Sequence, residues 1–268
     1  LILQNSSTLS MKHASPQKVN IGGTYISNVS LEDTLEIFSK AIENHVKKRI
    51  CVIPVNCIVW AGENKALQQI YNTADLALCD GVPILWMSKL FGTPLKGRVT
   101  GLDLLPSFIK VCAEKNYSIF LLGAKPGVGN QLAEQLQKTY PALRISGIYT
   151  PPMAASFSEE ENQRMVDLIN AAAPDIVWVS LSAPKQDYWI AEHFTKLNTK
   201  IVIGVGGAFE VSAGLIARAP KWMQQNGLEW LFRFLQEPKR LFYRYFIEAP
   251  RIIPLILKQL FLQKDKHA

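Results

Sequence analysis

Several features are scarce in this sequence of 268 residues, and each scarcity excludes a class of protein. Its four cysteines form no C-x-x-C pair and its four histidines are scattered, so we expect neither a disulfide scaffold nor a zinc module. Charged residues make up only 19% of the chain against 48% hydrophobic residues, a balance that excludes intrinsic disorder. The longest apolar runs, near 50–55 and 252–257, contain prolines and are far shorter than the roughly 18 residues of a transmembrane helix.

The first residues, the cysteines and the chain length predict the cellular compartment and the number of hydrophobic cores. The first ten residues contain neither a basic segment nor a long apolar one, so they do not resemble a secretory signal. Cysteines in apolar surroundings are typical of reduced, buried thiols, which fit the cytoplasm. We therefore expect a cytoplasmic protein, and the chain length favours one main core.

Short β-rich runs alternate with helical patterns through most of the chain, which is typical of a parallel sheet covered by helices. The predicted strands are Ile50–Val55, Leu76–Cys79, Ser118–Leu122, Ile176–Leu181 and Ile201–Val205. The predicted helices are Ala61–Asn72, Leu102–Lys115, Gly129–Tyr140, Glu159–Ala173 and Lys185–Leu197. The fold class is therefore α/β, a Rossmann-like and mostly parallel sheet with helices on both faces, to which a basic helical C-terminal appendage is attached.

The C-terminal part of the chain differs in composition from the rest. From residue 218 onward it holds ten lysines and arginines against four acidic residues, so it carries +6 of the net charge of +7. We predict a polar lead-in over 1–18, a catalytic domain over 19–217 and a basic aromatic appendage over 218–268. Prolines at 220, 238, 250 and 254 are expected to divide the appendage into short helices. Such a tail indicates an anionic partner, namely phosphate, nucleic acid or an acidic lipid surface.

Asp80 is the first candidate for chemistry. In open parallel sheets ligands lie beyond the carboxyl ends of the strands, and Asp80 follows the strand that ends at Cys79 and precedes Gly81. A carboxylate in this place is well seated to act as a general base. It could equally cap a helix that begins near Pro83, and position alone does not separate the two roles.

Glycine-rich turns follow two other predicted strands. Gly123 and Gly127 lie in a strand, turn and helix pattern over 121–136, and Gly206 and Gly207 follow the strand that ends at Val205. Such turns expose backbone amides to a phosphate at a helix N-terminus. Turn geometry alone would also explain them, because neither a Walker A loop nor a G-x-G-x-x-G sequence is present.

Three further polar residues lie in loops or at strand ends. Asn56 follows the first predicted strand, Arg98 lies between two glycines where its guanidinium could bind a phosphate, and Gln186 lies at a strand-to-helix junction within reach of a sugar. A solvated surface arginine and a simple helix start at Pro184 are the alternatives for the last two.

The chain contains no D-x-D tripeptide or other pattern that favours a hard cation, so we expect no metal ion and no cofactor. If a nucleotide diphosphate leaves during catalysis, cationic side chains would have to neutralise its charge in place of a metal. Four appendage arginines are spaced at 7, 4 and 7 residues with aromatic residues between them: Arg233, Arg240, Arg244 and Arg251. This pattern also resembles an interfacial element on anionic lipid, although a solvated surface or a subunit contact would show it too.

Six motifs in order carry a family resemblance: CDGVPI (79–84), GRVTGLDL (97–104), LLGAKPGVG (121–129), PDIVWVSLSAPKQDYWI (174–190), GVGGAFEVSAG (204–214) and RAPKWMQQNGLEWLFRFLQEPKRLFYRY (218–245). From about residue 19 to residue 246 the chain closely resembles the WecG/TagA/CpsF glycosyltransferases, glycosyltransferase family 26. The resemblance implies a Rossmann-like fold with a mobile C-terminal appendage. It also implies transfer of a sugar, often N-acetylmannosamine, from a UDP-sugar to a sugar on a polyprenyl diphosphate, with inversion and without a metal.

The resemblance also implies roles for individual residues. Asp80 becomes the base, while Asn56, Arg98 and Gln186 become polar groups of the active site. The appendage arginines that would meet the diphosphate are Arg233, Arg240 and Arg244. The implied partners are a UDP-sugar, a lipid-linked sugar and an anionic membrane, so the enzyme would be peripheral on the cytoplasmic face. No nucleic acid is expected, and a homo-oligomer is left open.

Departures from the family pattern leave the donor sugar open. The family sequence T-P-N reads Pro54-Val55-Asn56 here, so a threonine hydroxyl is missing, and a family aspartate is Glu210. A UDP-glucose-dependent exopolysaccharide enzyme of the same family is therefore an alternative. A nicotinamide oxidoreductase would need G-x-G-x-x-G after its first strand, and a non-catalytic lipid- or nucleic-acid-binding module would not need Asp80.

Overall fold

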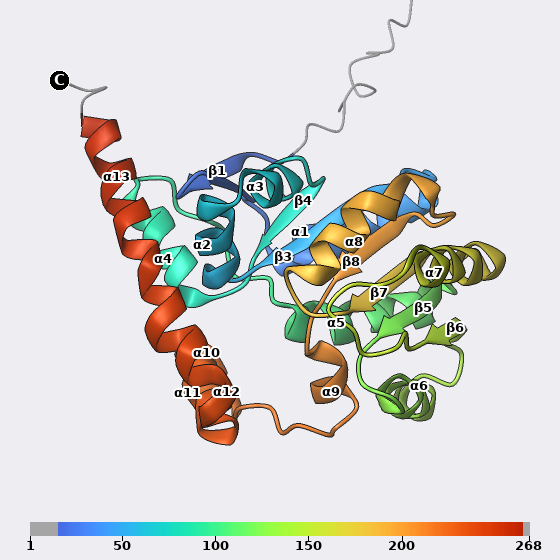
Figure 1. The fold of residues 1–268 in the computed structure, drawn as a ribbon. Helices are drawn as coiled ribbons and strands as arrows, with labels where there is room; N and C mark the ends of the chain where they lie inside the picture. The colour runs from blue at the N-terminus through green and yellow to red at the C-terminus, as the bar shows by residue number, and fades with distance from the viewer. Residues whose placement is uncertain (1–15, 265–268) are drawn as a thin grey trace, which may run out of the picture.

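The computed structural model describes residues 16–264, and its centre is a six-stranded sheet (Figure 1). The strands of this sheet are β3 (Lys48–Ile53), β4 (Leu76–Cys79), β5 (Ser118–Gly123), β6 (Arg144–Tyr149), β7 (Ile176–Ser180) and β8 (Ile201–Gly204). Their spatial order is β4-β3-β8-β7-β5-β6, and every neighbouring pair is parallel. The predicted α/β class and the five predicted strands are confirmed.

The sequence prediction missed β6 and an N-terminal hairpin. β6 is an edge strand whose residues are exposed or half-buried, so it lacks the continuous apolar run that marks the central strands. The hairpin pairs β1 (Lys18–Ile21) with β2 (Thr24–Ser27) through Gly22 and Gly23, which both have positive φ. Such a Gly-Gly turn between short strands is a standard hairpin signal. The predicted polar lead-in over 1–18 therefore overlaps β1, and residues 1–15 of it lie outside the described residues.

Helices cover both faces of the sheet because successive strand residues point to opposite sides. Ile50 and Val52 face α1 (Leu31–Glu43) and α5 (Gly101–Lys115), and the same layer contains α6 (Val128–Thr139) and the short α9 (Ala208–Ser212). Cys51 and Ile53 face the other layer. That layer holds α2 (Val55–Glu63), α3 (Lys65–Asn72), α4 (Val82–Leu90), α7 (Glu159–Ala172) and α8 (Lys185–His193), the last followed by the 3₁₀ turn Phe194–Lys196.

The predicted helix over 61–72 is wrong in its start and in its continuity. Helix α2 begins at Val55, directly after β3, and ends before Asn64. The Asn64 side chain then accepts a hydrogen bond from the amide of Leu67 at 3.1 Å and so caps a separate helix, α3. The early start of α2 places Asn56 in its first turn, close to the end of the strand.

The appendage is more continuous than its prolines predict. The short helices α10 (Lys221–Gln225) and α11 (Glu229–Gln236) come first. From Pro238 the chain runs through α12 (Pro238–Phe242), a π turn (Tyr243–Glu248), a 3₁₀ turn (Ala249–Arg251) and α13 (Ile252–Lys264) as one helical rod, red in Figure 1. The prediction of helix breaks at Pro250 and Pro254 is wrong. A proline lacks the N–H that a regular helix uses, and the local changes to π and 3₁₀ hydrogen bonding let the rod continue without it. Pro238 does start a new helix.

Helix α13 lies against the body of the protein at the N-terminal hairpin and α2. The Gln259 side chain accepts from the amide of Gly22 at 2.7 Å and donates to the carbonyl of Asn20 at 2.8 Å. Ile256 is buried in the core layer on this side, and Arg251 forms an ion pair with Glu63 of α2. The division of the chain at 217/218 stays a prediction, and residues 265–268 of the predicted appendage lie outside the described residues.

Candidate functional site

Asp80 lies at the carboxyl end of β4, beside the end of β3. Its amide donates to the carbonyl of Ile53 at 3.0 Å, which continues the parallel pairing by one residue. Gly81 follows with φ +134°, a conformation that side chains other than glycine rarely adopt. Gly81 is the N-cap residue of α4, and that helix start has no side-chain cap. Asp80 is therefore not the cap of α4, which removes the structural alternative for this residue.

Arg98 is held next to Asp80 by the loop that precedes α5. The amide of Val99 donates to the carbonyl of Cys79 at 2.8 Å, so the loop is tied to the last residue of β4. The Arg98 side chain is 19% exposed and faces the carboxylates of Asp103 (3.7 Å) and Glu229 (3.6 Å). It is thus not the solvated surface arginine that the alternative interpretation required.

The third part of this cluster joins α2 to the appendage. Asn56 is buried in the first turn of α2, and its Oδ1 accepts two hydrogen bonds from Arg244, at 3.2 Å from Nε and at 2.9 Å from a terminal nitrogen. Arg244 comes from the π turn of the helical rod. Two residues that lie 188 positions apart are thereby brought together at the sheet edge.

The surroundings of Asp80 favour a carboxylate that can exchange a proton near neutral pH. Burial raises the pKa of Asp80 to about 6, while the positive charges of Arg244 and Arg98 act in the opposite direction. Glu229 and Asp103 add smaller upward contributions to the same pKa. A base works best when its pKa lies near the working pH, so this electrostatic setting suits proton transfer.

The other two predicted arginines do not reach this cluster. Arg233 lies 3.4 Å from the carboxylate of Glu237, and Arg240, whose side chain is 58% exposed, pairs with the same carboxylate. The hydrogen bond from Arg240 holds the pKa of Glu237 below its ordinary value, and the charge of Lys125 contributes in the same direction. Of the three predicted diphosphate arginines, Arg244 is therefore the one that hydrogen-bonds a residue of this cluster within the described residues, although the charges of Arg233 and Arg240, like that of Asp80, act on the pKa of nearby Tyr245.

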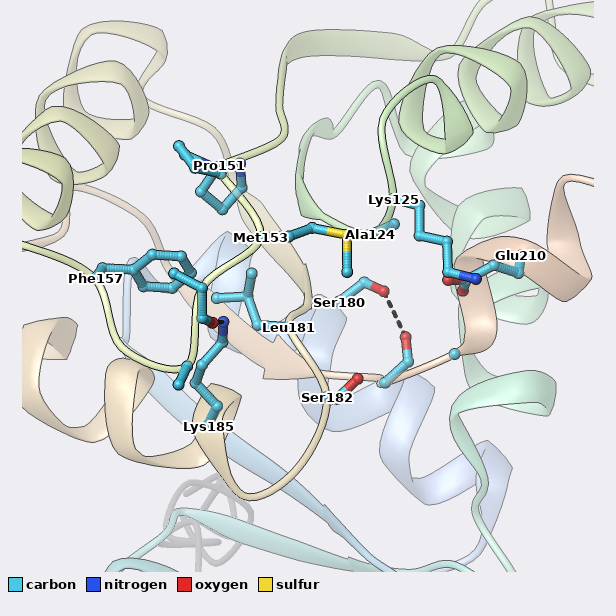
Figure 2. Close-up of a pocket in the computed structure, with 15 residues that line it drawn as sticks. Ala124, Lys125, Pro151, Met153, Phe157, Ser180, Leu181, Ser182, Lys185 and Glu210 are labelled. Atoms are coloured by element: carbon cyan, nitrogen blue, oxygen red, sulfur yellow. Dashed lines mark hydrogen bonds between the residues drawn. The ribbon is translucent and has the colours of Figure 1, made fainter. Parts of the chain in front are cut away.

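A second feature lies at the carboxyl ends of β5, β7 and β8. It is an open cavity of about 410 Å³ (Figure 2). Its walls come from the glycine turn after β5, the loop that follows β6, the turn after β7 and the turn after β8. Representative lining residues are Lys125, Phe157, Ser182, Lys185, Gly207 and Glu210.

Tight turns shape this cavity. Gly123 has φ +103°, and a Cβ there would lie 2.5 Å from the carbonyl oxygen of Ser180, so the ends of β5 and β7 could not approach with any other residue. Gly127 is the N-cap of the twelve-residue helix α6, whose first amides point toward the turn. Gly206 lines the cavity, and Ser180 donates to its carbonyl at 2.6 Å.

Gln186 lies beneath the Gly206 turn. Its side chain is buried, and its Oε1 accepts from the amide of Gly206 at 3.1 Å. It also packs on Gly204, where a Cβ would lie 2.6 Å from its Nε2. The structure therefore shows Gln186 holding a turn of the cavity wall, and its predicted contact with a sugar stays a prediction.

The sequence prediction missed several residues at these two places. Lys125 lines the cavity beside Glu210, the residue that replaces the family aspartate. Asp103 and Glu229 face Arg98, and Arg218 pairs with both of these carboxylates. Thr100 and Asp103 had a usable signal, since their spacing is typical of a helix start, and Thr100 accepts from the Asp103 amide at 3.1 Å. No local pattern marks Glu229, because one of its partners, Arg98, lies 131 positions away and the other, Arg218, lies 11 positions away, before the start of α10.

Within residues 16–264, no three His, Cys, Asp or Glu side chains are grouped so that they could hold a metal ion. In the same residues, no helix has both the length and the apolar character needed to cross a bilayer.

Known proteins show what this chain is similar to. Residues 19–266 match the model of the glycosyl transferase WecG/TagA/CpsF family. The chain is 30% identical over 198 residues to an N-acetylglucosaminyldiphosphoundecaprenol N-acetyl-beta-D-mannosaminyltransferase of Bacillus spizizenii, with 74% of each chain covered. It is 27% identical over 226 residues to the enzyme of the same name from a strain of Staphylococcus aureus, covering 84% of this chain and 87% of the relative. Because the family model spans nearly the whole sequence, this chain belongs to the WecG/TagA/CpsF family of glycosyltransferases.

Proposed function

We propose that this glycosyltransferase moves N-acetylmannosamine, or a related hexose, from a UDP-sugar to a sugar on a polyprenyl diphosphate, with inversion and without a metal ion. One observation carries the proposal. The desolvated carboxylate of Asp80 lies at the carboxyl edge of the sheet among Asn56, Arg98 and Arg244, in a chain whose relatives are named as enzymes acting on a diphosphoundecaprenol-linked sugar.

Asp80 acts as the general base. With a pKa of about 6 it is mostly ionised at pH 7, so it can accept the proton of the acceptor hydroxyl as that oxygen attacks the anomeric carbon. The nucleotide departs from the opposite face of the sugar, and a single displacement of this kind inverts the anomeric centre. Positioning of the two substrates supplies a large part of the rate.

The cavity of Figure 2 is proposed to bind the donor nucleotide. Its walls combine apolar surface from Pro151 and Phe157 with Ala124 and Lys125, which lie in the turn between Gly123 and Gly127, and with the turn at 206–207. Backbone amides at the N-terminus of α6 suit a phosphate, because they carry partial positive charge and lack partners within the helix. Lys125 adds a full positive charge at the same turn.

Arginines are proposed to replace a metal at the departing diphosphate. Arg244 and Arg98 approach the Asp80 carboxylate closely enough to lower its pKa, so either can meet negative charge that develops at the reacting centre. Arg233 and Arg240 lie on the same appendage and pair with Glu237 in this structure. Contact of these two with substrate would require exchange of that carboxylate for phosphate.

Pro54 supports a second candidate donor. It is the N-cap residue of α2, two positions before Asn56, and it replaces the threonine of the family pattern. A sugar pocket that lacks this hydroxyl would discriminate less strongly in favour of the N-acetylmannosamine donor. UDP-glucose is therefore the alternative donor to test first.

The appendage is proposed to hold the enzyme on the cytoplasmic face of the membrane. Three apolar residues of α13 at helical spacing are strongly exposed, namely Ile253 (56%), Leu257 (49%) and Phe261 (66%). They form a stripe on the side of α13 away from Ile256. An exposed apolar stripe on a basic helical element is typical of binding at the headgroup boundary of anionic lipid.

The proposal is tested by turnover with a panel of UDP-sugars and a short-chain acceptor carrying N-acetylglucosamine on a polyprenyl diphosphate. We expect transfer of N-acetylmannosamine or glucose, a product of inverted configuration, and full activity in excess EDTA. Activity that EDTA abolishes and magnesium restores would overturn the metal-free mechanism. Absence of transfer from every UDP-sugar, by protein that is folded, would overturn the proposed donor class.

A further inference from the structure

Four charged side chains next to Asp80 form a closed ring. Arg218 donates from Nε to Glu229 at 2.9 Å and pairs with Asp103 through a terminal nitrogen. The second oxygen of Asp103 lies 3.7 Å from Arg98, and the second oxygen of Glu229 lies 3.6 Å from Arg98. Each carboxylate thus faces both arginines, and positive and negative charges alternate around the ring.

The ring joins the two parts of the molecule. Arg98 and Asp103 belong to the loop and helix start beside β4, whereas Arg218 and Glu229 lie at the beginning of the appendage. The four side chains are between 11% and 26% exposed, so their interactions are screened less than those of ordinary surface pairs. Arg218 also donates to the carbonyl of Leu102 at 3.1 Å, which anchors it to the first turn of α5.

The two arginines of the ring are held differently. Arg218 makes close hydrogen bonds, while both contacts of Arg98 are longer than hydrogen bonds. Asp103 is itself fixed, because Thr100 donates to its Oδ2 at 2.9 Å. Three members of the ring therefore form a rigid frame, and Arg98 sits in its electrostatic field with donors that remain available to another anion.

We propose that Arg218 and Glu229 are positioning residues that hold the Arg98 guanidinium at Asp80. The appendage thus contributes to the catalytic site in two ways, directly through Arg244 and indirectly through the residues that hold Arg98. The proposal rests on the proposed function, because it assigns Arg98 a part in the transfer reaction. Neither Arg218 nor Glu229 touches the substrate. Glu229 also raises the pKa of Asp80 through its charge, so the effect on turnover is compared at a pH well above that pKa, where Asp80 is ionised in every variant and the remaining effect passes through Arg98.

A double-mutant cycle tests this dependence. Glu229→Gln keeps the shape of the side chain and removes the charge that faces Arg98, and we expect kcat to fall about tenfold, since misplacement of a reacting group by 1 Å can cost up to 10²-fold. Arg218→Lys should act in the same direction, because a lysine cannot make the paired contacts of a guanidinium. In an Arg98→Ala background, the same substitutions should have almost no further effect on kcat.

Two control variants separate positioning from general loosening. Glu63→Gln weakens a different ion pair between the appendage and the body, the one with Arg251. Glu43→Gln removes the carboxylate that pairs with Lys115 at 2.7 Å, near the amino ends of the strands. Both are expected to leave kcat unchanged. Additive effects of Glu229→Gln and Arg98→Ala, or an equal loss of kcat in Glu63→Gln, would overturn the positioning role.

Hydrogen exchange supplies a readout that needs no substrate. Amides over 97–100 should exchange faster in Glu229→Gln than in the wild-type protein or in Glu43→Gln, because the frame around this loop is loosened. Unchanged exchange at 97–100 would contradict the inference even if the protein transfers no sugar. An inactive wild-type protein that shows the expected exchange would instead contradict the proposed function alone.

Discussion

The body and the appendage of this protein are stabilised in different ways. In the body, every residue of β4, β5, β7 and β8 is buried, and helices cover both faces of the sheet. In the appendage, large apolar side chains remain exposed, including Trp230 at 42% and Phe242 at 52%. The appendage is instead attached through a small set of contacts, which includes the buried side chain of Ile256 and the hydrogen bonds of Gln259 and Arg244.

This difference separates the proposed tasks of the two parts. A packed body can hold a carboxylate in a desolvated place at a strand end, which requires rigid surroundings. An element attached by few contacts can present charge and apolar surface to a partner. We therefore expect substitutions in the body to affect chemistry most strongly, and substitutions in the appendage to affect diphosphate and membrane contacts.

The largest effect is expected at Asp80. Asp80→Asn should lower kcat by about 10²-fold or more, because the amide cannot accept the acceptor's proton. In the wild-type enzyme, kcat/KM should fall as the pH drops through about 6, where Asp80 becomes protonated. Initial rates across pH measure both effects. Near-normal turnover by folded Asp80→Asn would show that another group is the base.

The same substitution should stabilise the fold, which distinguishes a lost base from a damaged structure. The folded-state pKa of Asp80, about 6, lies above the ordinary aspartate value, so the folded protein binds this proton more tightly than the unfolded chain does. The stabilisation of the fold that comes from this tighter proton binding is fully present at low pH, and it is lost as the pH rises through 6. At pH 7, Asp80→Asn should therefore raise the free energy of unfolding, by on the order of 1–3 kcal/mol. Urea unfolding measures the change.

The next largest effect on kcat is expected at Arg244, and Arg240 of the same helical rod provides the comparison. Arg244→Ala should lower kcat by roughly 10- to 100-fold, since it removes a charge near Asp80 and two hydrogen bonds to Asn56. Arg240→Ala should cost less, because Arg240 is exposed and already paired with Glu237. Turnover of both variants, at saturating donor, measures the difference. Equal losses would indicate that the appendage rearranges before it meets the diphosphate.

A smaller effect is expected on membrane binding. Leu257→Glu combined with Phe261→Glu should weaken co-sedimentation with anionic liposomes by about tenfold, because side chains that insert only partly at the headgroup boundary contribute a fraction of the roughly 1.5–3 kcal/mol of full burial. Leu168→Glu, which alters an exposed leucine on α7, is the matched control and should bind normally. The assay is run at two salt concentrations, because lipid attraction is screened within about 10 Å at 0.1 M salt. Undiminished binding by the double variant would assign the stripe to another contact.

The smallest effect concerns Pro54. Pro54→Thr can add an N-cap hydrogen bond to α2, worth about 1 kcal/mol, but it gives up a proline whose rigidity contributes about 0.4–1 kcal/mol. Stability should therefore change little, while the ratio of N-acetylmannosamine to glucose transfer should rise a few-fold. Pro54→Val has the shape of threonine without the hydroxyl and should leave the ratio as it is. A ratio that Pro54→Thr does not alter would assign the family hydroxyl to helix capping.

The sequence predicts the body far better than the appendage, and burial explains why. The strand over 176–180 is apolar except for Ser180 at its end, so its pattern can be recognised without knowledge of its neighbours. The edge strand β6 has no such pattern. The rod from Pro238 to Lys264 depends on contacts with α2 and the hairpin, which no local pattern contains, and its prolines therefore predict breaks that do not form.

Some residues of the candidate site can be predicted from the sequence, whereas the contacts between them cannot. Asp80 and the glycine turns can be predicted, because the carboxyl ends of parallel strands meet at one edge of a sheet. The pairing of Asn56 with Arg244, and the ring around Arg98, join segments more than 100 residues apart. Spacing predicts that appendage arginines share a face, but it does not show which of them lies at the sheet edge.

The hydrogen bond between Gly22 and Gln259 also has a consequence for biosynthesis. Its partners are separated by 237 positions, so α13 cannot make this contact until residue 259 has left the ribosome. The sheet can form earlier, since domains fold from the N-terminus during synthesis. Closing so long a loop costs only slightly more entropy than closing a short one, so late docking carries little thermodynamic penalty. The nascent chain can therefore form the end of β4 with Asp80 first, and Arg244 reaches Asn56 later, after the appendage has been synthesised.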